Sequence, residues 1–265
     1  MFLRSNLAAH GIGGAAHPHA TIYHRCPEDG PIRAIFGRSN GGGLMMQAPF
    51  GCDKQALSAY VDALQGHTLV GLTGAADQTL ELLAELGWQH LGNLQLDKVE
   101  PLYRLELVKL AATPARLVRP SAANAPRLTD WFEAYLQETG LPMPGFSLRQ
   151  AAEQRCQSAI EADDVGFLVR QGVPVAMAAL NAKVGSAVQV GGVFVPQGAR
   201  NQGFGRQVTQ ALLAGARDKG ATDAYLSANN AAACRAYEAI GFGRIGDYRI
   251  ALLHAPVTFE RSLCP

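Results

Sequence analysis

The chain has 265 residues, of which 48% are hydrophobic and 17% are charged, and its formal net charge is +1 at pH 7. This length and apolar content are enough for two domains with buried cores. A charge this close to zero gives no electrostatic basis for binding nucleic acid or an anionic membrane. No apolar run reaches the roughly 18 residues of a membrane span.

Cysteine and histidine usage argues against a metal site. The five cysteines are Cys26, Cys52, Cys156, Cys234 and Cys264. Their odd number and wide spacing favour free thiols in a reducing cytoplasm over a disulfide scaffold or a zinc site. His17-Pro-His19 lies near His10 and His24, but no cysteine or carboxylate cluster joins them, so we expect no metal. The N-terminus lacks the apolar run of a signal peptide, and a cytoplasmic location is expected.

In the first 110 residues, the pattern predicts a strand, turn and strand over 32–49, with Gly41-Gly-Gly43 as the hairpin turn. A strand follows at 68–73, then a helix at 75–86 that ends before Gly87-Trp88, and a strand at 102–107. The sequence Glu-Leu-Gly-Trp88 parallels Ala-Ile-Gly-Phe242 near the other end of the chain. This parallel suggests that the first half is a decayed copy of the second.

A linker containing Ala-Ala-Thr-Pro is predicted next, which gives domains at 1–110 and 117–265 around a linker at 111–116. The second domain begins with a strand at Leu117 and two amphipathic helices. Three strands follow, of which the first two flank a hairpin turn at Gln171-Gly172. The predicted ranges are 124–138 and 148–161 for the helices, and 165–170, 173–181 and 187–195 for the strands.

The last of these strands leads into the sequence Arg200-x-x-Gly203-x-Gly205, which opens another amphipathic helix. Unpaired backbone N–H groups and the positive end of the helix dipole make such a site favourable for an anion. A Walker A loop is excluded because no Lys-Ser/Thr follows either glycine, and a Rossmann fingerprint fails at Val208. The alternative to an anion-binding loop is a glycine turn that only caps an ordinary core helix.

The helix after the loop is predicted to end at Gly220, because glycine is favoured just past a helix C-terminus. A short strand is predicted at 223–227, then a helix at 231–240 with Asn229-Asn230 at its N-terminus, and strands at 244–253. The element order of the second domain is therefore β-α-α-β-β-β-α-β-α-β-β.

The chain resembles the GNAT N-acyltransferases in this element order, in the Arg-x-x-Gly-x-Gly loop and in the spacing of residues from Asn230 to Phe242. The family pattern Asn-Pro-x-Ala-x-x-x-Tyr-x-x-x-Gly-Phe is matched by Asn230, Ala233, Tyr237, Gly241 and Phe242, with Ala231 in place of the proline. The segments Phe2-Leu-Arg-Ser-Asn-Leu and Leu102-Tyr-Arg-Leu also resemble a bacterial group of tandem GNAT-like predicted acetyltransferases. The resemblance implies an α/β fold with a mixed sheet, a degenerate N-terminal half and an active C-terminal domain.

The resemblance implies acetyl-CoA as the acyl donor. Backbone N–H groups around residues 202–205 would hold the pyrophosphate, and the strand before the loop would diverge from its neighbour and pair with pantetheine. The residues assigned to acyl-CoA are Val193, Val195, Arg200, Asn201, Gln202, Gly203, Phe204, Gly205, Arg206, Asn230 and Ala233. Tyr237 would be the general acid that protonates the CoA thiolate. Two alternatives stay open: Tyr237 as a half-buried core residue and Asn230 as a plain helix cap.

The general base is not assigned, because the strand that feeds the loop carries no carboxylate and Gln189 cannot accept a proton. Glu133, Glu138, Asp247 and His254 are candidates that more often serve as surface groups. The expected acceptor is a small-molecule or peptide amine, and a homodimer stays open. Two other functions also stay open: an acyl-CoA-binding sensor or interaction module without catalysis, and a nucleotide site in an unrelated α/β protein.

Overall fold

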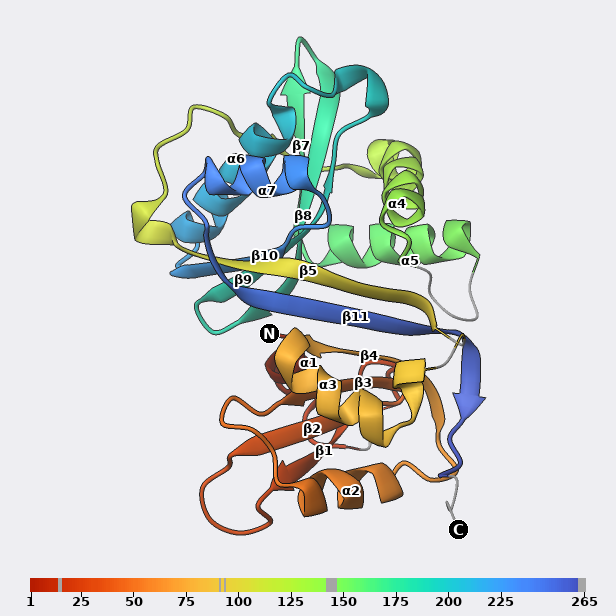
Figure 1. The fold of residues 1–265 in the computed structure, drawn as a ribbon. Helices are drawn as coiled ribbons and strands as arrows, with labels where there is room; N and C mark the ends of the chain where they lie inside the picture. The colour runs from red at the N-terminus through yellow and green to blue at the C-terminus, as the bar shows by residue number, and fades with distance from the viewer. Residues whose placement is uncertain (14–15, 91, 93, 142–146, 262–265) are drawn as a thin grey trace. The chain divides into compact units, whose positions relative to one another are not determined.

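The fold is described from a computed structural model, which covers residues 1–13, 16–90, 92, 94–141 and 147–261. The chain forms two compact units (Figure 1). The central unit consists of Pro101–Ile245 together with Met1. The terminal unit consists of Phe2–Glu100 and the C-terminal segment that starts at Gly246.

The central unit is built on a mixed sheet with the order β5-β10-β9-β8-β7-β6. Its strands are β5 (Leu94–Glu106, from Pro101 on), β6 (Leu117–Val118), β7 (Val165–Arg170), β8 (Val173–Val184), β9 (Ala187–Phe194) and β10 (Asp223–Ser227). Only β9 and β10 run parallel, and the other described neighbours in this sheet are antiparallel. The predicted mixed α/β fold is confirmed, and the strands at 165–170 and 223–227 have the predicted bounds.

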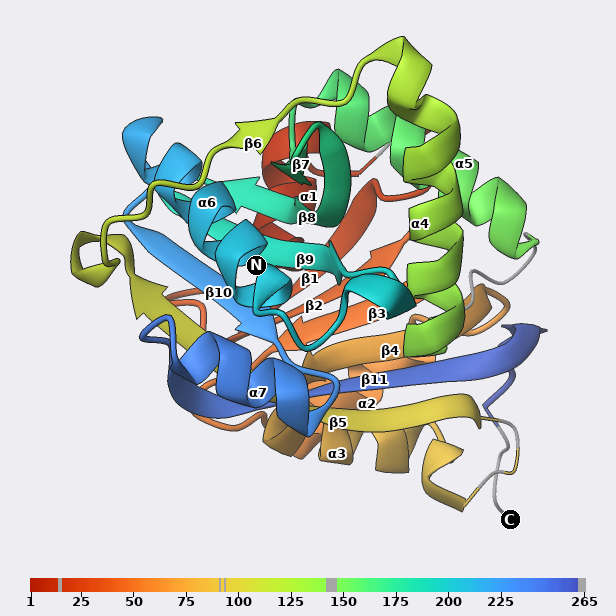
Figure 2. The ribbon, with the colours of Figure 1, turned by 90° about the horizontal axis from the view of Figure 1, so that it is seen from above.

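Helices cover both faces of this sheet. Helices α4 (Ala125–Thr139) and α5 (Leu148–Glu161) pack on one face, and α6 (Phe204–Asp218) packs on the other (Figure 2). The alternation of strand side chains explains this arrangement, because Met177 and Ala179 belong to the core with α4 and α5, whereas Ala176 and Ala178 face α6. Helix α7 (Ala231–Glu238) shares a core with α6 and β10. Short 3-10 turns occur at Leu107–Lys109, Ala122–Asn124 and Gln197–Ala199.

The terminal unit has the strand order β1-β2-β3-β4-β11. Its strands are β1 (Thr21–Cys26), β2 (Ala34–Ser39), β3 (Gly43–Gln47), β4 (Thr68–Ala75) and β11 (Gly243–Thr258, from Gly246 on). Its helices are α1 (Phe2–His10), α2 (Lys54–Asp62) and α3 (Ala76–Glu85), with a 3-10 turn at Trp88–His90. The hairpin turn at Gly41-Gly-Gly43 is confirmed, since β2 and β3 pair on either side of it. Elements α1, β1 and α2 were not predicted.

The compact units differ from the predicted division at residues 111–116. Tyr103, Leu105 and Leu107 are buried in the core of the central unit, so the chain before the predicted linker belongs with α6 and α7. Conversely, Ala251 and Leu253 are buried in the core of the terminal unit. Strands β5 and β11 therefore each begin in one unit and end in the other. The strands predicted at 244–253 form a single long strand.

Candidate functional site

Strand β9 separates from β10 partway along its length. Their parallel ladder contains three pairs and ends where Gln189 lies opposite Tyr225. On its other side, β9 stays paired with β8 as far as Phe194, which lies opposite Met177. From Val190 onward, β9 therefore has no strand partner on the β10 side within the described part of the chain. Val193, one of the residues predicted to align pantetheine, lies on this open edge, and Val195 directly follows the end of β9.

A β-bulge coincides with this separation. Gly191 pairs with Ala179 and Phe194 pairs with Met177, so two residues of β9 lie opposite one residue of β8. Gly192 adopts a φ of 59° there, a left-handed conformation that glycine takes without steric cost. A bulge bends its strand and increases the local twist. A second irregularity leaves Asn181 of β8 unpaired opposite the step from Gln189 to Val190, so both irregularities of the β8–β9 ladder lie at or just after the end of the β9–β10 ladder.

The loop after β9 ends in the uncapped N-terminus of α6. Asn201 and Gly203 are both left-handed, with φ values of 62° and 75°. Gly203 is the N-cap residue, and no side chain caps the helix there. The first helical hydrogen bond runs from the Gln207 N–H to the Gly203 carbonyl, at 3.1 Å. The N–H groups of residues 203–206 precede this first helical bond, and a helix N-terminus of this kind favours an anion, so it lies where the N–H groups of residues 202–205 are predicted to hold the pyrophosphate.

The Arg200 side chain holds this loop in place. Its Nε donates to the Val195 carbonyl at 3.0 Å, and its Nη2 lies 2.5 Å from Glu138 Oε1 on α4. The guanidinium also lies 6.0 Å from the ring centre of Phe194. Arg200 therefore fixes the shape of the loop, and its charge is already paired. Asn201, Gln202 and Arg206 are exposed beside it.

Helix α7 carries the remaining residues that were predicted for the site, including Tyr237, and Asn230 is its N-cap. The Asn230 side chain caps the helix by accepting a hydrogen bond from the Ala233 N–H at 2.9 Å. Tyr237 is only 8% exposed, and its ring packs edge-to-face on Phe242 with centres 6.1 Å apart. Asn230 is thus a helix cap and Tyr237 a member of the α6–α7 core, and both roles are compatible with contacts to a ligand.

The candidate bases lie in different surroundings. Glu133 accepts from Arg149 at 3.1 Å, and Glu138 is paired with Arg200. Asp247 and His254 belong to the terminal unit, outside the unit that carries the loop. The two glutamates of the central unit are therefore held by cations, and the base stays unassigned.

A second polar cluster lies on the α4–α5 face, beside the bulge. Arg155 on α5 donates from Nη2 to Asn181 Oδ1 at 2.6 Å. Its guanidinium carbon lies 5.3 Å from the ring centre of Phe132 and 5.4 Å from that of Tyr135. Neither Arg155 nor Asn181 was predicted. The sequence signal that could have indicated this cluster is Asn181, a polar residue at the end of the apolar run Ala-Met-Ala-Ala-Leu, on the strand next to Gly191 and Gly192.

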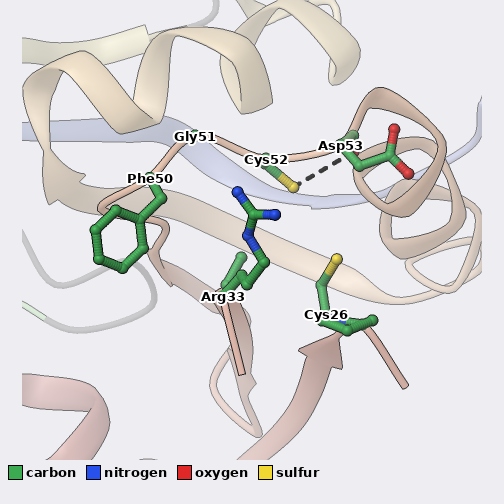
Figure 3. A pocket seen from close by; sticks show the side chains of 8 residues that line it. Cys26, Arg33, Phe50, Gly51, Cys52 and Asp53 are labelled. Atoms are coloured by element: carbon green, nitrogen blue, oxygen red, sulfur yellow. Dashed lines mark hydrogen bonds between the residues drawn. The ribbon is translucent and has the colours of Figure 1, made fainter. Parts of the chain in front are cut away.

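A cavity of about 440 Å³ lies in the terminal unit, and its lining includes none of the residues predicted for the acyl-CoA site (Figure 3). Arg33, Phe50 and Asp53 line it together with Cys26 and Cys52. The Cys52 Sγ donates to the Asp53 carbonyl at 3.4 Å. Burial, followed by the neighbouring Cys26 and two carboxylates, raises the pKa of Cys52 to about 11. Cys52 is therefore a protonated thiol at neutral pH and a poor nucleophile.

Two features are absent from the described residues. None of the helices there combines the length and apolar character of a membrane span. In the same residues, no three His, Cys, Asp or Glu side chains are grouped closely enough to hold a metal ion.

Comparisons with known proteins agree with this geometry. The model of the acetyltransferase (GNAT) family matches residues 126–242. A GNAT-family acetyltransferase from Colwellia psychrerythraea has a similar structure, with a TM-score of 0.57, 16% identity, and coverage of 89% of this chain and 87% of that one. A GCN5-related N-acetyltransferase from Kribbella flavida gives a TM-score of 0.56, 18% identity, and coverage of 84% and 87%. No curated protein matches in sequence. Residues 126–242 therefore carry the match to the GNAT family model, and the chain shares its fold with solved GNAT acetyltransferases.

Proposed function

We propose that the central unit transfers an acetyl group from acetyl-CoA to a primary amine. The observation that carries this proposal is the open edge of β9 next to the uncapped N-terminus of α6. A strand edge offers N–H and C=O groups to the amides of pantetheine, and a helix N-terminus offers N–H groups to a pyrophosphate. The two features are consecutive in the chain, joined by the loop that Arg200 holds, so a single extended ligand can use both.

The reaction is a direct transfer. The amine nitrogen attacks the thioester carbonyl carbon, the C–S bond breaks, and the acetylated amine loses a proton to water. Tyr237 gives its phenolic proton to the departing thiolate and regains one from solvent. Holding both substrates on one rigid strand supplies proximity and orientation.

The absence of a carboxylate on β9 favours a second candidate, a domain that binds acyl-CoA without catalysis. CoA release with a thiol reagent, measured across a panel of amines, separates the two candidates. Amine-dependent CoA release supports the transferase. Acetyl-CoA binding without release for any amine supports the sensor.

We also propose that the terminal unit is a degenerate GNAT-like half. Its parallel strands β3 and β4 are followed by helix α3 and the Gly87-Trp88 pair. This order repeats that of β9, β10, α7 and Gly241-Phe242, with a shorter connection between the strands. It lacks the Arg-x-x-Gly-x-Gly loop.

A further inference from the structure

Two consecutive glycines of β9 leave room for the polar cluster beside the bulge. A Cβ atom on Gly191 would lie 1.9 Å from Asn181 Nδ2, so only glycine lets the Asn181 side chain lie against the strand. A Cβ atom on Gly192 would lie 3.2 Å from Phe132 Cε1 and 3.7 Å from Arg155 Nη2. The Arg155 guanidinium therefore lies next to the backbone of the bulge, directly before Val193.

Among the described residues, no acidic side chain neutralises the charge of Arg155. None of the ion pairs there includes Arg155, and its one hydrogen bond within this part of the chain is to the neutral amide of Asn181. By contrast, Arg149 on the same helix contacts three carboxylates, those of Asp130, Glu133 and Glu153. Arg155 is also half-buried on the Phe132 and Tyr135 rings. A partly desolvated cation without an anion is costly, which indicates that a ligand supplies the anion.

We propose that Arg155, held by Asn181, binds a carboxylate of the acetyl acceptor, so that the acceptor is an amino acid and not a simple amine. This inference rests on the proposed function, which brings the thioester to the open edge at Val193. A carboxylate on Arg155 would then hold the amine of the same small molecule against the bulge. A guanidinium presents a planar fork that matches a carboxylate in two hydrogen bonds. One isolated positive charge also suits a monoanion better than a phosphate dianion.

The test compares amino acids with the amines formed by removing their carboxylate. We would measure kcat and KM for alanine against ethylamine, phenylalanine against phenethylamine, and lysine against cadaverine. The wild-type protein should favour at least one amino acid by about 10²-fold in kcat/KM, the discrimination expected when a buried charged partner is left unpaired. R155Q should lose this preference mainly through KM, and R155K should recover only part of it because lysine lacks the fork.

The matched control is R127Q, which removes an exposed arginine from α4 and leaves the cluster intact. It should keep the wild-type preference, and R155Q should keep the wild-type affinity for acetyl-CoA. If acetyl-CoA binds and simple amines react as well as amino acids, the inference is wrong and the proposed function stands. If acetyl-CoA does not bind, the proposed function fails. Titration of the N-acetyl derivatives of the same amino acids then decides the inference alone: tighter binding to wild type than to R155Q supports it, and equal or absent binding overturns it.

Discussion

Gln189 lies opposite Tyr225 in the last pair of the ladder between β9 and β10. Beyond this pair, β9 continues along β8 to Phe194 and leads into the loop at the N-terminus of α6. An open strand edge and an open helix end thus follow one another in the chain.

Tyr237→Phe removes the proposed general acid. We expect kcat to fall about 10²-fold or more, because the thiolate leaves without a proton, while the Kd for acetyl-CoA stays unchanged. Steady-state kinetics and calorimetry measure the two effects. Tyr103→Phe is the matched control, because Tyr103 lies in the same core and donates to Glu238 Oε1 at 2.8 Å. It should cost about 1 kcal/mol of stability and leave kcat unchanged. Lost donor binding with normal turnover in Tyr237→Phe would refute the acid role.

Asn230 tests whether a cap residue also contacts the ligand. Asn230→Ala should lower the free energy of unfolding by about 1 kcal/mol, since the Ala233 N–H loses its acceptor. Asn230→Ser keeps a capping oxygen but loses the amide, and it should be close to wild type in urea unfolding. If Asn230→Ser binds acetyl-CoA as tightly as wild type, Asn230 is a cap and not a ligand contact.

Arg200 and Glu138 form an exposed pair, with side chains 40% and 51% exposed. Glu138→Gln should therefore change the free energy of unfolding by less than about 1 kcal/mol. Arg200→Gln also removes the donor to the Val195 carbonyl. It should therefore bind acetyl-CoA more weakly than Glu138→Gln does, by about 1 kcal/mol. Equal acetyl-CoA affinities for the two variants would show that the Val195 contact does not shape the loop.

The raised pKa of Cys52 predicts slow alkylation of the folded protein. Its folded-state value of about 11 lies above the ordinary thiol value of 9.0, so the protonated form dominates until the pH approaches 11. Iodoacetamide reacts with the thiolate, and labelling of Cys52 at pH 8 should be much slower in the native protein than in urea at the same pH. Peptide mass spectrometry follows the single site. Equal rates in the two states would contradict the shift.

The sequence predicted most of the central unit because its local signals agree with its tertiary structure. Residues 148–161 form a helix with the predicted bounds, supported by the capping box between Ser147 and Gln150. The glycines at 203 and 205 marked the start of α6 correctly. In both places, cap chemistry and apolar periodicity indicate the same boundary.

What the sequence did not predict depends on contacts between distant residues. Arg155 and Asn181 are 26 positions apart, and only the pairing of β8 with β9 brings Asn181 against Gly191. The division of β5 and β11 between two units also follows from which core buries Tyr103 and Ala251, and strand propensity does not indicate which core a strand residue joins.

Calorimetric titration with acetyl-CoA, with ATP and NAD as controls, tests the central claim most directly. We predict micromolar binding of acetyl-CoA, about −8 kcal/mol, and no competition by either nucleotide. Absence of acetyl-CoA binding, or displacement by ATP or NAD but not by CoA, would contradict the assignment of the β9 edge and the α6 N-terminus to an acyl-CoA.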